Sequence, residues 1–268
     1  MRNADLLARR KKKDIEYVAT EGDVQKLNWL SSNLEPWDQV EKLWQESFES
    51  RRMVLKNLQI HEYIEKFPCL KTQAGKRMFL LDFKRLYPNE DFIETSKWSN
   101  KIRPCLVEHL GKVNFKSVHE AALLEALKSN DLSEEKQNFV TLYLLPHIIP
   151  TKRSGKRKKD NAEPVERPHR LSLQERRESF ILNVQTANDV QTRINDLKQR
   201  LLRSKLTFQP LIVAVGPETN IEKLYVAVND QLYSINSILT AIKLAIAVFF
   251  FGHFYKGFSL ILSYLQIY

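Results

Sequence analysis

The sequence has little cysteine and little glycine, and both shortages restrict the class of protein. Its two cysteines, Cys69 and Cys105, are too few for a disulfide framework, or for a zinc module without histidine ligands. We therefore expect a reducing compartment. Seven glycines and ten prolines in 268 residues exclude a collagen-like or low-complexity chain, and the 14 Phe, 9 Tyr and 4 Trp are typical of a packed globule.

The sequence motifs of common enzyme and cofactor sites are incomplete. His119-Glu120 begins as a zinc-protease helix does, but Leu123 stands where the second histidine is needed. Residues 252–259 have the glycine spacing of a phosphate-binding loop, but Phe258 occupies the place of its lysine. No Cys-x-x-Cys and no pair of histidines four residues apart is present. We therefore expect no cofactor, no bound metal and no enzymatic activity.

The first half of the chain has helical periodicity. Apolar residues recur every three or four positions, for example at Trp37, Val40, Trp44 and Phe48. A stretch from residue 98 to residue 110 continues this pattern and is expected to bend at Pro104. The pattern predicts an all-helical bundle over residues 14–150.

The second half combines short apolar runs with helical segments. Residues 172–175 have the spacing of a capping box, which starts a helix. Strands are predicted at four β-branched or alternating runs: 180–184, 211–215, 224–228 and 231–235. A helix is expected after the first strand, around 190–201, and an apolar closing helix over 238–251. The chain is therefore predicted to be an α+β protein, with a small α+β domain at residues 172–268.

The net charge of +10 is concentrated in two segments. Residues 1–13 carry +5 and residues 151–177 carry +6, so the remainder of the chain is close to neutral. We interpret residues 1–13 as a basic tail. Residues 151–171, which lack periodicity, are interpreted as a basic linker between the two predicted domains.

The basic linker contains a candidate nuclear-import cluster. Six cations are close together in it and could be bound by a nuclear import receptor: Lys152, Arg153, Lys156, Arg157, Lys158 and Lys159. The alternatives are a solvating linker, or non-specific binding of nucleic acid through phosphates. No run of 7 to 15 apolar residues follows the basic residues 9–13, so no secretory signal is expected. The expected location is nuclear or cytoplasmic.

The C-terminal apolar segment has two interpretations. Residues 238–251 fit a closing helix of the α+β domain, whereas a segment near 237–265 could anchor the chain in a membrane by its tail. Lys243 falls inside the apolar run and Gly252 interrupts it before a span of about 20 apolar residues is reached. These two residues favour the closing helix.

Several short segments resemble a known group of proteins. They include residues 35–38 with Trp44, residues 67–70, residues 86–88 and the apolar run 209–216. Over residues 27–268 the chain is similar to the region downstream of the sterile alpha motif in the metazoan group typified by sterile-alpha-motif-domain protein three. The resemblance implies that residues 238–251 belong to a soluble domain, and it supplies no catalytic residues. The sterile alpha motif is not found in this sequence.

Together these observations predict a non-enzymatic interaction or adaptor protein inside the cell. Its protein partner is not identified by the sequence. The alternative is a tail-anchored membrane protein.

Overall fold

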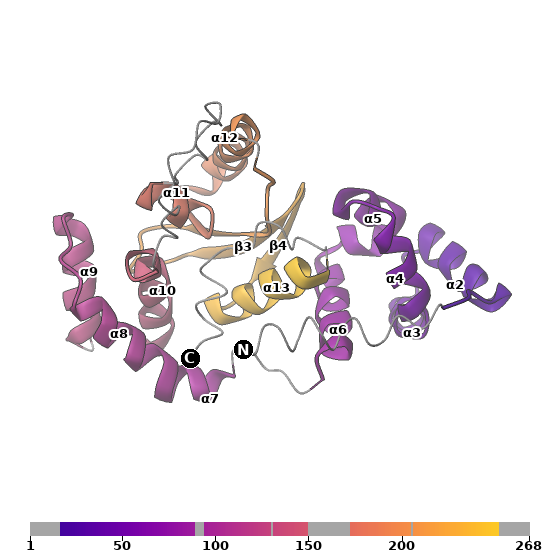
Figure 1. Ribbon diagram of the computed structural model, residues 1–268, viewed down its shortest axis with the longest axis horizontal. Helices are drawn as coiled ribbons and strands as arrows, with labels where there is room; N and C mark the ends of the chain where they lie inside the picture. Colours follow the sequence, from indigo (N-terminus) through magenta and orange to yellow (C-terminus); the bar gives the residue numbers. More distant parts are fainter. Residues whose placement is uncertain (1–16, 89–93, 130, 150–171, 205, 252–268) are drawn as a thin grey trace, which may run out of the picture. The chain divides into compact units, whose positions relative to one another are not determined.

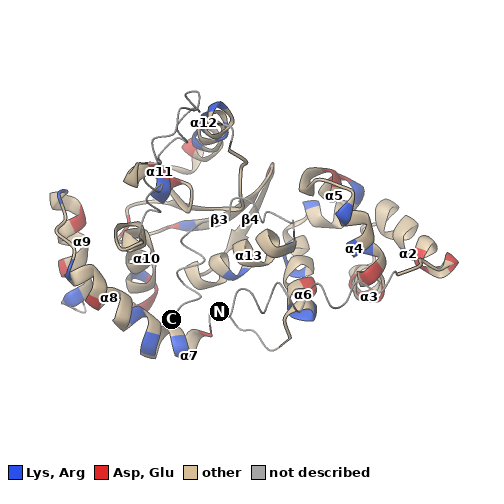
Figure 2. Ribbon diagram, viewed as in Figure 1, with Lys and Arg blue, Asp and Glu red and all other residues tan. Residues whose placement is uncertain are grey.

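The computed structural model describes residues 17–88, 94–129, 131–149, 172–204 and 206–251 (Figure 1). It divides into two compact units, Met1–Leu86 and Tyr87–Tyr268. The first is helical, and the second combines helices with a four-stranded mixed sheet. The predicted α+β class is therefore confirmed. Acidic and basic residues both occur along the helices of each unit in the view of Figure 2.

The described part of the first unit consists of α-helices and two 3-10 turns. They are α2 (Glu21–Ser32), α3 (Trp37–Glu46), α4 (Phe48–Lys56), α5 (Ile60–Lys66), η1 (Pro68–Lys71), η2 (Gln73–Gly75) and α6 (Lys76–Leu86). Helix α2 begins at a capping box, because the side chains of Thr20 and Asp23 each accept the other's backbone amide. Leu86 ends α6 two residues before Pro88, as the proline predicts.

Aromatic side chains form the centre of the first unit. Trp44, Tyr63 and Phe67 are fully buried and meet edge to face, with ring centroids 4.9 to 6.3 Å apart. Gly75 allows η2 to approach η1, because a Cβ at this position would lie 2.5 Å from the Cys69 carbonyl oxygen. The apolar stripe predicted around Trp44 is therefore core.

The second unit begins with helices that precede the linker. They are α7 (Thr95–Lys97), η3 (Trp98–Ile102), α8 (Arg103–Gly111), α9 (Val118–Lys128), α10 (Glu134–Leu144) and η4 (Leu145–His147). The predicted bend at Pro104 takes another form, since η3 is a π-helical turn. This turn places Pro104 in the first turn of α8, where a proline is well tolerated.

The second unit continues with the sheet and its helices. The elements are α11 (Leu173–Glu178), β1 (Ile181–Val184), η5 (Ala187–Asp189), α12 (Val190–Arg203), β2 (Leu211–Val215), β3 (Lys223–Val228), β4 (Gln231–Ile235) and α13 (Ile238–Phe251). The strand order is β1-β2-β3-β4, with β1 parallel to β2 and the other pairs antiparallel. The predicted order of strands and helices is confirmed.

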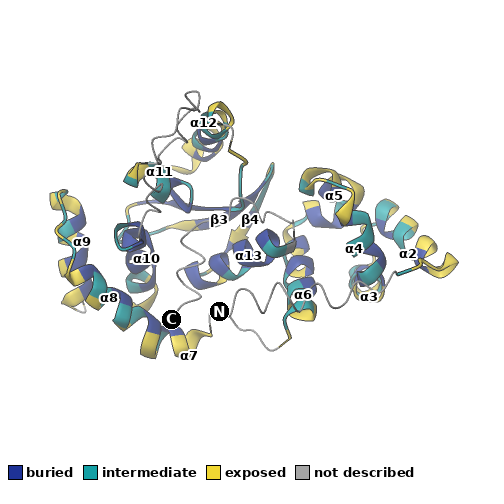
Figure 3. Cartoon of the chain, viewed as in Figure 1, coloured by how far each residue is buried: buried dark blue, intermediate teal, exposed yellow. Residues whose placement is uncertain are grey.

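One helix covers each face of the sheet. Val190, Ile194 and Leu197 of α12 pack on the face that carries Leu182, Val213 and the other inward residues of β1 and β2. Helix α13 packs against β2, β3 and β4, and Figure 3 shows both the strands and α13 as largely buried. Its residues Ile238 to Phe249 are buried except Thr240 and Lys243. The apolar run 238–251 is thus the closing helix of the α+β fold.

The boundary between the compact units differs from the predicted domain boundary. A helical domain at 14–150 and an α+β domain at 172–268 were expected, but α7 to η4 belong to the same compact unit as the sheet. The reason is direct packing, because α10 contacts α13 and η4 contacts α11. The basic tail 1–13 and the linker 151–171 lie outside the described residues.

Within the described residues, no helix combines the length and the apolar character needed to cross a membrane.

Candidate functional site

A cluster of titratable side chains lies in the second unit where four helical elements meet. Glu120 comes from the first turn of α9, Tyr143 from the last turn of α10, His147 from η4 and Arg177 from α11. We call these four residues the Glu120 cluster. The side chains of Glu120, His147 and Arg177 are only 8 to 15% exposed, so their interactions are little screened by water.

Arg177 is the hub of the Glu120 cluster. Its Nη2 forms an ion pair with Glu120 Oε1, and its Nη1 donates to the Tyr143 hydroxyl over 3.1 Å. The guanidinium also stands over the Tyr143 ring, 4.6 Å from its centroid. His147 Nε2 lies 3.2 Å from Glu120 Oε2 and 3.4 Å from Arg177 Nη2. One carboxylate therefore binds a guanidinium on one oxygen and an imidazole on the other.

Burial determines the protonation of this cluster. It lowers the pKa of His147, and although Glu120 acts in the opposite direction, the net shift is downward. Burial also raises the pKa of Tyr143, with Arg177 opposing it. Both side chains are consequently neutral at pH 7.

A second arginine joins α11 to the end of the preceding helical segment. Arg176 Nη1 donates to the backbone carbonyl oxygens of Pro146 and Ile149, each over 3.2 Å. Pro146 lies in η4 and Ile149 follows it, so both carbonyls belong to the segment after α10. Arg176 and Arg177 therefore connect residues on the two sides of the predicted linker.

Next to the cluster, the second unit has a cleft of about 350 Å³. The start of α10 forms one wall. The loop after β2, the start of β3 and the end of β4 form the other. Its charged lining consists of Glu135, Lys136, Glu218, Glu222 and Lys223, and its apolar lining includes Phe139, Ile221 and Leu224. The cleft is of mixed polarity, unlike the mainly apolar pockets that enclose small molecules.

Two glutamates of the cleft are engaged in the fold. Glu135 Oε1 accepts the backbone amide of Ile238 over 2.6 Å and so caps the start of α13. Glu218 Oε2 lies 3.4 Å from His119 Nε2, and Glu218 also interacts with Tyr143. Glu222 is exposed. Gly216, at φ 106°, starts the loop that carries Glu218 and Glu222.

The charged side chains of the Glu120 cluster are paired with one another, which limits the chemistry available at this site. Within the described ranges, no group of three or more His, Cys, Asp and Glu side chains could hold a metal ion. The Glu120 cluster contains neither a serine nor a cysteine nucleophile.

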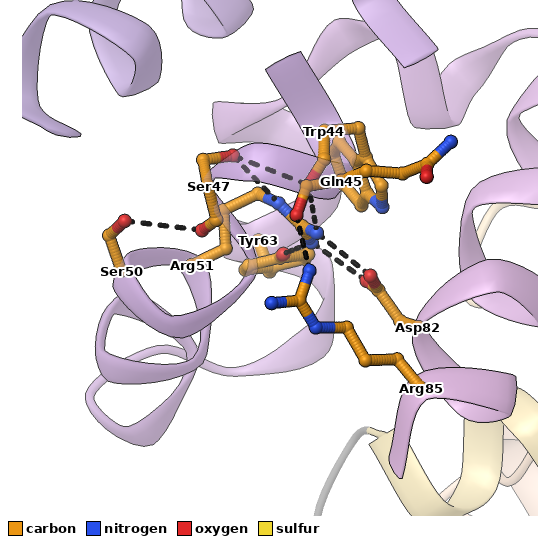
Figure 4. Close-up of polar contacts among 8 residues, drawn as sticks. All are labelled: Trp44, Gln45, Ser47, Ser50, Arg51, Tyr63, Asp82 and Arg85. Atoms are coloured by element: carbon orange, nitrogen blue, oxygen red, sulfur yellow. Dashed lines mark hydrogen bonds and ion pairs between the residues drawn. The ribbon is translucent and has the colours of Figure 1, made fainter. Parts of the chain in front are cut away.

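The first unit holds a separate buried polar cluster around Arg51 (Figure 4). All five N–H donors of this guanidinium have an acceptor. Nε donates to Ser47 Oγ, Nη1 to Tyr63 and Asp82, and Nη2 to Asp82 and the Trp44 carbonyl, over 2.7 to 3.2 Å. The guanidinium carbon also stands 3.5 Å from the Trp44 ring centroid.

The Arg51 cluster connects helices rather than binding a ligand. Burial disfavours the charged guanidinium, but Asp82 and Tyr63 together outweigh it and hold the pKa of Arg51 above its usual range. Arg51 is fully buried and its donors are fully used. Nearby, burial raises the pKa of the Cys69 thiol to about 12, so Cys69 remains protonated and unreactive.

The sequence predictions located neither polar cluster. The incomplete zinc-protease motif at His119-Glu120 gives no sign that Glu120 is buried and paired with Arg177 and His147, as the structure shows. Its partners are up to 57 positions away, and helical periodicity carries no signal for such a pairing. The adjacent arginines after the capping box were the available hint. The six predicted import residues, 152–159, and the glycine pattern at 252–259 lie outside the described residues.

Comparison of the chain with known protein families, curated proteins and solved structures finds no match. The resemblance to the sterile-alpha-motif-domain protein three group stays a prediction from the residues quoted above.

Proposed function

We propose that this chain is a non-enzymatic interaction or adaptor protein that binds a short protein segment in the cleft of its second unit. The observation that carries the proposal is the cleft itself. It lies between two elements distant in sequence and has both an apolar lining and charged side chains of both signs. Mixed surfaces of this kind are typical of transient protein recognition.

The charges of the cleft specify the kind of segment. Three carboxylates, at Glu135, Glu218 and Glu222, and two ammonium groups, at Lys136 and Lys223, line the cleft. Glu222 is exposed and Ile221 is half-buried beside it. We therefore propose a segment with a basic side chain next to an apolar one. The small size of the cleft favours a weak, reversible complex.

A peptide library tests this proposal. Fluorescence anisotropy of the full chain would be measured with three sets of peptides, in which an apolar residue neighbours a basic, an acidic or a neutral one. We expect binding to be confined to the basic set and to weaken with salt. Glu222→Lys should weaken it by about fivefold or more, because it replaces an exposed attraction by a repulsion.

The matched control is Glu21→Lys, which reverses an exposed glutamate in the first unit. It should leave peptide binding unchanged. Equal binding of all three sets, or equal effects of the two charge reversals, would contradict the proposal.

We propose nuclear import as the role of the basic cluster at 152–159. The support is its six cations within eight residues of sequence. Replacing Lys156, Arg157, Lys158 and Lys159 with alanine should move a tagged chain to the cytoplasm, as imaged in cells. An identical distribution of the parent and the variant would contradict this role.

A further inference from the structure

His147 occupies a position where its charge state decides which neighbour it can bind. Its Nε2 lies within reach of an acceptor, Glu120 Oε2 at 3.2 Å, and of a donor, Arg177 Nη2 at 3.4 Å. A neutral imidazole nitrogen can accept from Arg177 or donate to Glu120, depending on the tautomer. A protonated ring can only donate. Protonation therefore removes His147 Nε2 as an acceptor for Arg177 Nη2 and places two cations side by side.

The other groups around His147 do not cancel this effect. Glu120 faces it from α9, while Arg176 and Arg177 face it from α11. Tyr143 of α10 reaches it through Arg177, and Glu218 of the loop after β2 reaches it through Tyr143. The Phe115 ring covers the imidazole, with centroids 4.6 Å apart. Of the groups that act on His147 directly, one is a carboxylate and two are guanidiniums, so a proton on the ring adds to positive charge that is already in excess.

We propose that the Glu120 cluster is a pH-sensitive contact that holds α11 on α9 and η4 and loosens when His147 is protonated. Helix α11 leads directly into β1 and is joined to η4 by Arg176. Loosening of α11 would therefore weaken the contact between the helices that precede it and the sheet that follows it. This inference does not depend on the proposed peptide binding.

The direction of the pH dependence follows from burial. Burial lowers the pKa of His147 in the closed state, so an open state that hydrates the ring binds the proton more tightly. Opening is then favoured as pH falls through the histidine range. At pH values between the pKa of His147 in the closed state and its pKa in the open state, the equilibrium constant for opening should rise by up to about tenfold for each unit by which the pH falls.

Hydrogen exchange of the full chain tests the proposal. Amide exchange in α11 would be measured between pH 7.5 and pH 5 by mass spectrometry and corrected for the pH dependence of intrinsic exchange. We expect α11 to lose protection as the pH falls, with little change in α5. His147→Gln should abolish this pH dependence, whereas the control His61→Gln, at an exposed position of the first unit, should retain it.

A second measurement does not require a folded variant. An NMR titration of the His147 ring in the unaltered chain should give a pKa below the ordinary histidine value of about 6.5. A value at or above 6.5 would overturn the proposal. So would an α11 whose corrected exchange is independent of pH, or a His147→Gln chain that retains the dependence.

Discussion

At the scale of single residues, the Arg51 cluster explains how a charge can be buried in a small helical unit. Removing a guanidinium from water is costly unless each of its donors finds an acceptor. Arg51 meets that condition with acceptors from α3, α5, α6 and Ser47. The cluster therefore fixes the arrangement of these helices, and losing one partner leaves the other buried without compensation.

We predict that Asp82→Asn and Arg51→Met each lower the free energy of unfolding by about 3 to 5 kcal/mol. The double variant should be destabilised by clearly less than the sum of the two, because neither charge is then left alone. Urea denaturation followed by fluorescence measures all three.

Arg52→Met is the matched control on the same helix. Arg52 pairs with Glu49 on the surface, so its loss should cost at most about 1 kcal/mol. Additive effects of the Arg51 and Asp82 substitutions would show that the pair is not coupled.

Sequence reasoning could identify the helix that carries Arg51 but not the role of the residue. Trp44 and Phe48 define the buried face of their segment by spacing alone. Arg51 lies three residues beyond Phe48 and is also buried, but its partner Asp82 is 31 positions away. Periodicity assigns charged residues to the surface by default, so paired buried charges are the ones it misses.

At the scale of elements, strands and helices of the second unit follow the predicted order closely. Helix α13 and strands β2 and β4 have the predicted bounds, because β-branched runs separated by turn residues leave few alternatives. Asn229 has φ 55° in the turn between β3 and β4, a conformation that asparagine tolerates well. The π-helical turn before Pro104 was not predicted. A proline in a helical pattern indicates that the helix is interrupted or bent, but not which kind of turn results.

We predict that truncation after Asn236 makes the chain aggregate or be degraded. Helix α13 is buried against β2, β3 and β4, so its removal exposes the apolar face of the sheet. Losing about 600 Å² of apolar burial costs on the order of 15 kcal/mol, which exceeds the stability of a typical domain. Expression and size-exclusion chromatography of the truncated chain measure the outcome.

The tail-anchored alternative makes the opposite prediction. A chain anchored by residues 237–265 should resist alkaline carbonate extraction when intact and become soluble and folded after the same truncation. That pair of results would contradict the role of α13 as a closing helix in the cell.

At the scale of the whole molecule, the sequence indicated an all-helical part and an α+β part, but not where the boundary between the two compact units falls. The basic segment at 151–171 has the composition of a domain linker, yet α10 contacts α13, and Arg176 and Arg177 contact residues that precede the segment. The composition of a segment contains no information on whether the residues before it and after it pack against each other. The cleft and the Glu120 cluster both depend on this joining of residues before 150 and after 171.

Residues 94–149 and 172–251 therefore form one folded body, and cutting the chain between them tests this. A specific protease site would be inserted between Asp160 and Asn161, and the cut chain would be analysed by size-exclusion chromatography, with the uncut chain as control. We predict that the two fragments elute together without denaturant, and that Glu120→Lys, which repels Arg177, weakens their association. Fragments that separate while each remains folded would show that residues 94–149 and 172–251 are independent domains.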